Sequence, residues 1–346
     1  MKVLLYFENE KQIASSGIGR AMIHQLQACK SAGIDVTTDA SCEDYDILHI
    51  NTIGFNSNNM VRKARQLNKK VIYHAHSTEE DFRNSFILSN QVAPLFKIYI
   101  SNLYSSADYI LTPTPYSKSL LENYGISVPI EPISNGIDLD KFAYDDEKVY
   151  AFRKYFGLKP EDKVVMSVGW FFERKGILDF IEIARYFPTV KFIWFGELPN
   201  VTTPQNIKDA VNKAPDNVIF PGYVKGPIIQ GAYNNADIFF FPSYEETEGI
   251  VVLEAFASHA QVVVRDIGVY QGWLQDKRNC YKGNSIEEFV QIIDQLLSQQ
   301  LPTTRLNGYL TAKERSIDKI GQQLKRVYEH VLNMPLREKE DFNEVE

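Results

Sequence analysis

Short apolar runs alternate with segments of helical periodicity along the whole chain. The runs are four to six residues long and rich in Val, Ile, Phe and Tyr, which is typical of strands buried on both faces of a sheet. This alternation predicts an α/β fold with parallel sheets covered by helices. The predicted strands are Val3–Phe7, Asp46–Ile50, Val71–His74, Tyr109–Thr114, Ile130–Ser134, Val164–Gly169, Lys191–Gly196, Asn217–Pro221, Asp237–Phe241 and Gln261–Val264.

One polar stretch interrupts the alternation and divides the chain. Asp140 to Asp162 holds no clear buried strand, so we place a domain boundary there. We expect two Rossmann-like domains, 1–150 and 151–310, followed by a C-terminal helix and an acidic tail over 311–346. Two such domains would face each other across a cleft at the carboxyl ends of their strands, where open α/β sheets bind ligands.

Composition narrows the class of protein. The 346 residues carry 37 basic and 44 acidic side chains, a net charge of −7, which argues against nucleic-acid binding. Three widely spaced cysteines suggest a reducing compartment without disulfides or a zinc site. The five-residue apolar run near the start is too short for a signal peptide, and no run reaches the length of a membrane span. We therefore expect a cytoplasmic protein.

The stretch Phe239–Ala257 carries the strongest chemical signal. It predicts a buried strand, a Pro-Ser turn, an acidic loop and a helix that begins near Gly249. The free N–H groups of Gly249, Ile250 and Val251 favour an anion, and Glu246, Glu248 and Glu254 supply acceptors for hydroxyl groups. A nucleotide sugar fits this combination. The alternative is that the first two glutamates compensate the helix dipole and the third is a solvated surface residue.

Two further segments suit a phosphate group. Gly17 and Gly19 open a helix after the first strand, where glycine allows close approach of the backbone to an anion; a simple turn before a helix is the alternative. Arg174 and Lys175 follow the first strand of the second domain, where paired cations could hold a departing diphosphate. Two solvated charges in a turn are the alternative there.

Histidine and aspartate motifs are interpreted without a metal. His74 and His76 end a strand, and we expect only one of the two imidazoles to be buried, with His76 hydrogen-bonded to a sugar or to the acceptor. A structural histidine whose hydrogen bonds are satisfied within the protein is the alternative. No third ligand lies at a usable spacing. Asp138-Leu139-Asp140 and Asp44-Tyr45-Asp46 both spell DxD, but turn and cap chemistry explains them. We predict no required metal and no cofactor.

The first domain also holds a candidate membrane surface. Asn59–Lys70 is predicted as a basic helix without an acid, and Phe82–Tyr104 as an aromatic-rich one. Basic and aromatic helices side by side suit an anionic bilayer; a solvated face beside a core helix is the alternative. The basic residues are Arg62, Lys63, Arg65, Lys69 and Lys70.

Taken together, these motifs resemble retaining glycosyltransferases of the GT-B class, in the large group 1 family that contains sucrose and glycolipid synthases. The residues that carry the resemblance are Pro242, Ser243, Glu246 and Glu254, with Gly17, the Asn135-Gly136-Ile137-Asp138 turn and Lys175-Gly176 in the same order. More narrowly, three segments resemble Gram-positive synthases that add a second hexose to monoglucosyl-diacylglycerol. They are His76–Phe86, Thr112–Leu121 and Pro242–Ala255.

The resemblance implies a role for each matching position. Glu254 would bind the ribose hydroxyls and Glu246 the donor sugar, with Glu248 and the amides of residues 249–251 beside it. Lys175 would hold the diphosphate, Gly17 would approach the diphosphate from the other domain, and His76 would lie by the sugar. Tyr223 and Val224 would meet the base. The family usually has an arginine where this chain has Trp170, and we infer that Arg174 replaces it.

The sequence therefore predicts a metal-independent retaining hexosyltransferase. It would move glucose or galactose from UDP-glucose or UDP-galactose to α-monoglucosyl-diacylglycerol, making a membrane glycolipid of the kind that anchors lipoteichoic acid. Its partners would be the UDP-sugar, the glycolipid acceptor and an anionic membrane surface, with the protein peripheral on the inner face of the cell membrane. A nucleotide-sugar epimerase and a non-catalytic lipid- or sugar-binding module are the alternatives.

Overall fold

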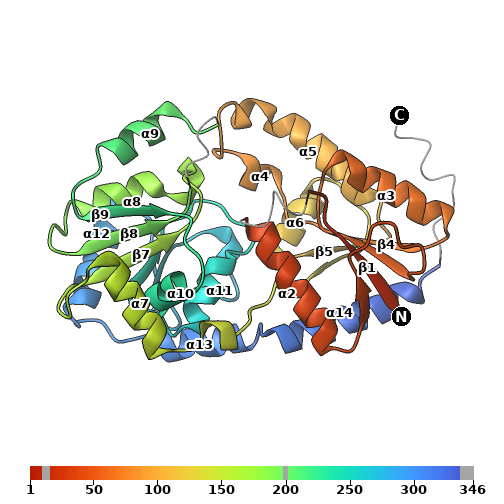
Figure 1. Cartoon of the computed structure of the whole chain (residues 1–346). Helices are drawn as coiled ribbons and strands as arrows, with labels where there is room; N and C mark the ends of the chain where they lie inside the picture. The colour runs from red at the N-terminus through yellow and green to blue at the C-terminus, as the bar shows by residue number, and fades with distance from the viewer. Residues whose placement is uncertain (10–15, 198–201, 336–346) are drawn as a thin grey trace. The chain divides into compact units, whose positions relative to one another are not determined.

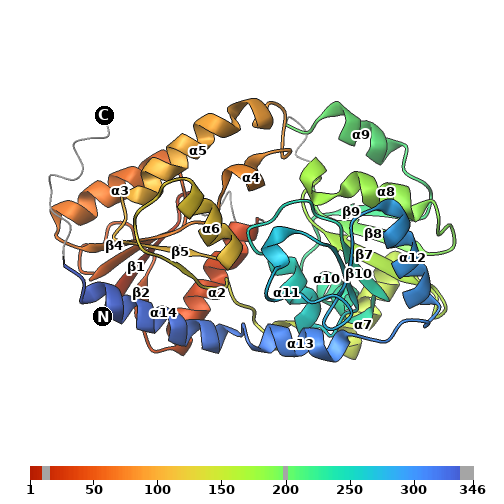
Figure 2. The same cartoon turned by 180° about the vertical axis from the view of Figure 1, so that it is seen from behind.

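The computed structural model describes residues 1–9, 16–197 and 202–335. The chain forms two compact units, each built on its own parallel sheet (Figure 1, and from behind in Figure 2). The first unit comprises Met1–Glu80, Gln91–Gly136 and the segment from Arg315 onward. The second comprises Asp81–Asn90 and Ile137–Glu314. The predicted α/β class with two sheets is confirmed.

The first unit contains six parallel strands in the order β2-β1-β3-β4-β5-β6. Their bounds are β1 Lys2–Tyr6, β2 Asp35–Thr37, β3 Ile47–Ile50, β4 Lys70–His74, β5 Tyr109–Thr112 and β6 Ile130–Pro132. The helices of this part of the chain are α2 Gly17–Ser31, α3 Phe55–Gln66, α4 Glu79–Phe82, α5 Ser89–Ser105, α6 Pro115–Asn123 and α14 Ile317–Leu332.

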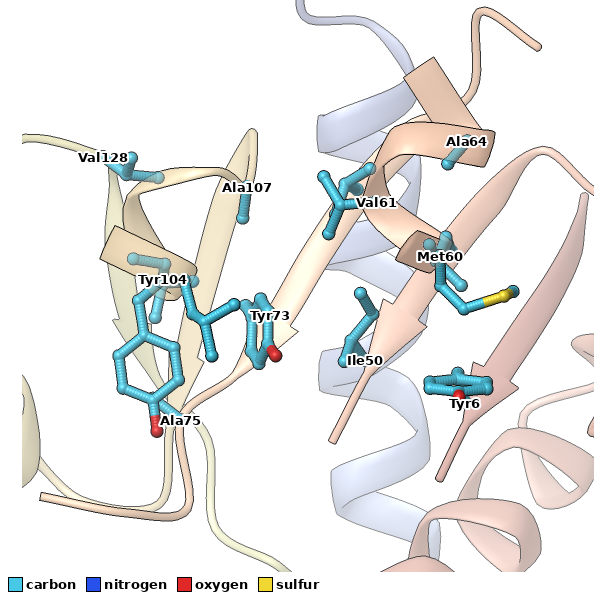
Figure 3. Packing of buried hydrophobic residues seen from close by; sticks show 14 of the residues in the cluster. Tyr6, Ile50, Met60, Val61, Ala64, Tyr73, Ala75, Tyr104, Ala107 and Val128 are labelled. Atoms are coloured by element: carbon cyan, nitrogen blue, oxygen red, sulfur yellow. The ribbon is translucent and has the colours of Figure 1, made fainter. Parts of the chain in front are cut away.

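Strand side chains of this sheet alternate between two apolar layers. Tyr6, Ile50 and Tyr73 point to the layer that packs with α3 and α5, where Met60 and Tyr104 meet them (Figure 3). Their strand neighbours point the other way, against α2 and α14. Both faces of every central strand are therefore buried, which is why the strands appear in the sequence as continuous apolar runs.

The second unit contains six parallel strands in the order β12-β11-β10-β7-β8-β9. Their bounds are β7 Val164–Val168, β8 Lys191–Phe195, β9 Val218–Gly222, β10 Ile238–Phe241, β11 Val262–Arg265 and β12 Tyr281–Gly283. The helices are η1 Asp140–Phe142, α7 Asp146–Phe156, η2 Glu173–Lys175, α8 Ile177–Ala184, α9 Gln205–Asn212, α10 Pro227–Asn235, α11 Ile250–Ala257, η3 Gly268–Tyr270, α12 Ile286–Leu297 and α13 Arg305–Lys313. Every predicted strand is present, whereas the short edge strands β2 and β12 escaped prediction.

The polar stretch after Asp140 forms structure of its own in the second unit. Asp145 caps α7 by accepting from the backbone N–H groups of Glu147 and Lys148, and Gly157 ends the helix in the left-handed conformation. α7 packs against α10, and Gly231 lies so close to α7 that a Cβ there would stand 2.0 Å from the Lys148 carbonyl oxygen. The chain leaves the first unit at Gly136, ahead of the boundary that polarity suggested.

The C-terminal region returns to the first unit. The single C-terminal helix expected after residue 310 is two helices, α13 and α14, separated at Glu314–Ser316. α14 packs along α2, and Gly321 permits the close approach, since a Cβ there would lie 2.3 Å from the Ala28 carbonyl oxygen. Within the described ranges, no helix has both the length and the apolar character needed to cross a bilayer.

Candidate functional site

The strand order of the second unit brings two distant loops together. β7 and β10 are hydrogen-bonded neighbours in the middle of the sheet, and both run in the same direction. Their carboxyl ends therefore lie at the same edge of the sheet. The loop that holds η2 and the loop that leads to α11 both begin there. Arg174 and Lys175 lie on the first loop and Glu246 on the second, 71 residues apart for the Lys175–Glu246 pair.

Lys175 and Glu246 form a buried ion pair at this edge. The lysine ammonium contacts Glu246 Oε1, and the same oxygen accepts a 2.7 Å hydrogen bond from Ser243 Oγ. The two side chains are 15% and 8% exposed. Burial lowers the pKa of Lys175, while the negative charge of Glu246 acts in the opposite direction. This edge of the sheet therefore holds one positive and one negative group, both largely buried and in contact with each other.

The Pro-Ser turn between β10 and α11 is fixed from two sides. Gly176 (φ 76°) approaches it so closely that a Cβ would lie 2.4 Å from the Pro242 carbonyl oxygen. Arg265 donates from Nε to that same oxygen at 3.0 Å and contacts Asp179 through Nη2. Its guanidinium lies 3.8 Å from the centre of the Tyr244 ring. This support escaped sequence analysis, because Arg265 ends an ordinary apolar strand.

The start of α11 carries the predicted acidic residues in buried positions. Gly249 (φ 85°) precedes the helix in the left-handed conformation, and Glu248 and Glu254 are 1% and 3% exposed. Glu254 Oε2 accepts a 2.7 Å hydrogen bond from Tyr233 on α10. The alternative of a solvated surface glutamate is therefore wrong for Glu254. The carboxylate of Glu254 is therefore oriented by a neighbouring helix.

Tyr270 lies at the same helix start and was not anticipated from the sequence. It is fully buried on η3, and a Cβ on Gly249 would stand 3.2 Å from its hydroxyl oxygen. Within the described residues that hydroxyl has no hydrogen-bond partner. Burial raises the pKa of Tyr270 well above its usual value, with Glu246 as the next cause. The phenol therefore remains a neutral donor beside the backbone N–H groups of α11.

Arg174 is held by a segment from the first half of the sequence. Its guanidinium pairs with Asp81 at 2.9 Å and donates to Ser85 Oγ at 2.7 Å, while its backbone N–H donates to the Asn84 carbonyl at 3.1 Å. Burial raises the pKa of Asp81, against the opposing influence of Arg174 and Lys175. Arg174 thus anchors residues 81–90, which belong to the second unit, and its expected contact with the diphosphate stays a prediction. The contact between Arg174 and Asp81 could not be predicted, because the two residues are far apart in the sequence.

The remaining predicted positions of the second unit also follow strands. Tyr223 and Val224 follow β9, with Lys225 Nζ 5.0 Å from the centre of the Tyr223 ring. Trp170 follows β7 and meets Phe172 edge to face. Residues 198–201 of the loop after β8 lie outside the described ranges. Among the described residues, no group of three or more histidine, cysteine, aspartate or glutamate side chains is placed to hold a metal ion.

In the first unit, Gly17 and His76 lie at carboxyl ends of the sheet. Gly17 begins α2, and a Cβ there would meet no atom within 4 Å, so packing does not require glycine at this position. His74 and His76 are 1% and 8% exposed. The expectation that only one imidazole is buried is wrong, because residues two apart share one face of a strand and the two rings stack at 4.2 Å.

The structure revises the predicted basic surface. α3 ends at Gln66, and Lys70 belongs to β4, where it is buried and donates to the carbonyl oxygens of Met334 and Pro335. Arg65 pairs with the buried Asp108 at 2.7 Å. These two cations support the fold, so we remove them from the expected membrane surface. Lys63 pairs with Glu43 at 3.0 Å.

Exposed apolar side chains gather instead on α5 and at the start of α3. Leu95 and Ile98, three residues apart, are 68% and 58% exposed, and Val92 is 44% exposed. Phe55, the first residue of α3, is 87% exposed. The aromatic-rich segment Phe82–Tyr104, expected as one helix, begins at the last residue of α4 and becomes helical again only in α5. We call Val92, Leu95 and Ile98 the α5 apolar face.

Comparison with known proteins identifies relatives along most of the chain. Residues 150–317 match the family described as "Glycosyl transferases group 1", and residues 32–141 match "Glycosyltransferase Family 4". The chain is 47% identical over 337 residues to the processive diacylglycerol alpha-glucosyltransferase of Acholeplasma laidlawii, covering 96% of this chain and 99% of that one. It is 27% identical to the alpha-galactosylglucosyldiacylglycerol synthase of Streptococcus pneumoniae, covering 74% of this chain and 69% of that one.

Solved structures show the same fold. Alr3699/HepE of Anabaena, solved in complex with UDP-glucose, superposes with a TM-score of 0.77 at 17% sequence identity, covering 95% of this chain and 100% of that one. WaaG, a glycosyltransferase involved in lipopolysaccharide biosynthesis, superposes with a TM-score of 0.67 at 15% identity, covering 94% and 99%.

Proposed function

The chain belongs to the group 1 glycosyltransferases, and from that membership we propose that it transfers a hexose from a UDP-sugar to a glycosylated diacylglycerol. The observation that carries this proposal is the almost end-to-end correspondence with the diacylglycerol glucosyltransferase of Acholeplasma laidlawii. The streptococcal relative, a galactosylglucosyldiacylglycerol synthase, supports a glucosylated lipid as acceptor. We propose UDP-glucose or UDP-galactose as donor.

Donor binding is assigned to the edge of the second sheet. Lys175 and the backbone N–H groups of residues 249–251 would hold the diphosphate, because both present positive charge at the start of α11. Glu254, oriented by Tyr233, would accept from the ribose hydroxyls, and Glu246 would contact the hexose. Glu248 lies beside them, and Tyr223 with Val224 would meet the base. For Gly17 and His76, the donor contacts that the family resemblance implies stay predictions.

The chemistry follows from where charge develops. The bond between the anomeric carbon and the phosphate oxygen breaks, leaving negative charge on the diphosphate and oxocarbenium character on the sugar. Lys175 and the helix N–H groups stabilise the first charge, and Glu246 stabilises the second. The acceptor hydroxyl attacks the same face of the sugar, and its proton passes to the departing phosphate oxygen. This course retains configuration, and with these groups in place we propose that no metal is required.

The α5 apolar face and Arg62 are proposed to rest on an anionic bilayer. Leucine and isoleucine side chains exposed to this extent on one helix suit the boundary between headgroups and acyl chains, and the exposed cation on α3 suits anionic headgroups. A lipid acceptor keeps its acyl chains in the membrane, so the enzyme must approach the surface. We therefore place the protein peripherally on the inner face of the cell membrane.

A transfer assay tests the function. The protein is incubated with labelled UDP-glucose or UDP-galactose and with anionic liposomes that contain monoglucosyl-diacylglycerol, and the lipids are identified by mass. A dihexosyl lipid formed from one donor supports the proposal. Interconversion of the two UDP-sugars without acceptor would instead identify an epimerase, and liposome binding without release of UDP would identify a non-catalytic module.

The relative's description as processive favours a second form of the same activity. A processive enzyme would accept diacylglycerol as well as its own glycosylated product. Supplying diacylglycerol alone in the same assay distinguishes the two forms. Successive appearance of mono- and dihexosyl lipid indicates processive transfer, whereas product from the glucosylated lipid alone indicates a dedicated second transferase.

A further inference from the structure

Three buried imidazoles form a continuous stack in the first unit. His74 and His76, on and just after β4, have ring centres 4.2 Å apart, and His49 on β3 stacks on His74 at 5.5 Å. The planes are nearly parallel, with angles of 9° and 4°. His49 Nδ1 lies 2.7 Å from the hydroxyl of Tyr328 on α14. The stack thus connects the C-terminal helix to His76.

A pair of side-chain amides sets the protonation of this stack. Gln25 on α2 donates from Nε2 to Asn51 Oδ1 at 2.8 Å, and the same amide nitrogen lies 2.7 Å from His74 Nδ1. Asn51 Oδ1 also lies 2.9 Å from His76 Nε2. An amide oxygen only accepts hydrogen bonds, so His76 Nε2 carries the proton in this arrangement. Its Nδ1 is then a lone-pair acceptor, and no group in the described part of the chain bonds to it.

The surroundings keep these rings neutral. Burial lowers the pKa of His49 to about 3 and that of His76 to about 3. Burial also lowers the pKa of His74, and repulsion by His76 and His49 adds to it. Among the described residues, the titratable ring that stacks on His76 is His74, followed by His49 and then Tyr328. A neutral ring with a fixed tautomer is an acceptor at every physiological pH.

We propose that Asn51 and Gln25 are positioning residues that hold the proton of His76 on Nε2, so that Nδ1 accepts a hydrogen bond from a substrate hydroxyl. The inference rests on the proposed function, because it takes that hydroxyl from the sugar or the glycolipid. Asn51 determines the tautomer directly, and Gln25 orients Asn51 while bonding His74 behind it. Neither residue needs to touch the substrate.

Substitutions at Asn51 separate positioning from ordinary packing. In Asn51→Asp the carboxylate still accepts from Nε2, but its charge raises the pKa of His76. Once His76 is doubly protonated, Nδ1 cannot accept. We expect kcat of this variant to fall about tenfold between pH 8.5 and pH 6, while wild-type kcat changes less than about twofold. Asn51→Leu, which lacks any acceptor, should stay low at both pH values.

The matched control is Asn333→Asp, the same change at an exposed position, which should follow the wild-type profile. Recovery of Asn51→Asp toward wild-type kcat at pH 8.5, with no recovery of Asn51→Leu, supports the proposal. Parallel pH profiles for wild type and Asn51→Asp would overturn it, as would wild-type kcat in Asn51→Leu.

A spectroscopic measurement tests the tautomer without activity. Long-range ¹H–¹⁵N spectra of wild-type protein labelled in its histidine rings report which nitrogen carries the proton, with His76 assigned from the signal lost in His76→Gln. A proton on Nε2 supports the inference, and a proton on Nδ1 overturns it. Absence of any hexosyl transfer by wild-type protein would overturn the proposed function alone, since the spectrum is recorded independently of the reaction.

Discussion

At the scale of single residues, Lys175 matters most to the proposed chemistry. Its ammonium is buried and already balanced by Glu246, so a diphosphate that binds there competes with a carboxylate for one cation. The N–H groups at the start of α11 and the hydroxyl of Tyr270 supply the further donors that such a dianion needs. The proposed diphosphate site therefore combines one side-chain cation with several fixed dipoles.

The first prediction concerns Lys175→Ala. We expect kcat to fall by about 10²- to 10³-fold, because the positive charge beside the leaving group is lost. Stability should also fall by about 3–5 kcal/mol, since Glu246 is left as an unpaired buried carboxylate. Initial rates and urea unfolding measure the two effects.

A double variant separates these effects. Lys175→Met with Glu246→Gln should regain much of the lost stability but none of the lost turnover. The matched surface control is Lys163→Ala, which breaks a more exposed pair with Asp237 and should change stability by less than about 1 kcal/mol. Wild-type turnover in Lys175→Ala would refute the leaving-group role.

The second prediction concerns acid stability. The folded-state pKa of His49 is about 3, against an ordinary value of 6.5. The unfolded chain therefore takes up protons first as the pH falls, and stability present above pH 6.5 is lost between pH 6.5 and pH 3. One such histidine costs about 2 kcal/mol at pH 5 relative to pH 7.

Urea unfolding at pH 7 and pH 5 measures this loss. His49→Gln should lose about 2 kcal/mol less than wild type over that interval, whereas His330→Gln, an exposed histidine on α14, should lose as much as wild type. Equal losses in all three proteins would show that the His49 imidazole does not resist protonation.

At the scale of elements, the sequence predicted those strands that can be recognised from the length and periodicity of their apolar residues. Strands buried on both faces appear as apolar runs, and all ten predicted runs are strands. Contacts between side chains that are distant in the sequence produce no such pattern. Arg65 and Lys70 look like solvated cations in sequence, yet one pairs with Asp108 from 43 residues away and the other bonds carbonyl oxygens 264 and 265 residues away. The sequence likewise did not predict that the α5 apolar face is exposed.

The third prediction tests that face. Changing Val92, Leu95 and Ile98 together to serine should reduce binding to anionic liposomes by about tenfold or more, because each removes apolar area from the bilayer contact. Stability should change little, since the side chains are exposed. Vesicle sedimentation measures the binding.

The control for this surface comes from the second unit. Leu306 and Leu310 on α13 are 65% and 48% exposed, and changing both to serine should leave liposome binding unchanged. Equal losses of liposome binding in the two variants would show that exposed apolar side chains promote binding wherever they lie on the protein. That result would contradict a defined docking face on α5.

At the scale of the whole molecule, two segments belong to a different unit from the residues next to them in the sequence. Residues 81–90 belong to the second unit, anchored there by Arg174, and α14 belongs to the first. Neither follows from hydrophobic periodicity, because a segment's own pattern shows which face is apolar but not which sheet covers it. Glu246, Glu254 and Lys175 could be named as candidates because their motifs lie at strand ends. Tyr270, Arg265 and Asp81 carry no motif.

The fourth prediction concerns the return of the C-terminal helix. Gly321→Ala improves helix propensity by about 1 kcal/mol, yet the new Cβ would stand 2.3 Å from the Ala28 carbonyl oxygen. We expect a net loss of stability of about 1–3 kcal/mol as α14 moves away from α2. Gln322→Ala on the exposed neighbouring position is the control and should be neutral or slightly stabilising. A more stable Gly321→Ala protein in thermal unfolding would contradict the close packing.

The central claim is that the start of α11, with Lys175 and Glu246 beside it, holds the sugar nucleotide. A crystal structure of the protein with UDP tests this claim most directly. We predict the diphosphate within hydrogen-bond distance of Lys175 Nζ and the N–H groups of residues 249–251, with the ribose hydroxyls on Glu254. A nucleotide bound elsewhere, with the Lys175–Glu246 pair undisturbed, would contradict the account.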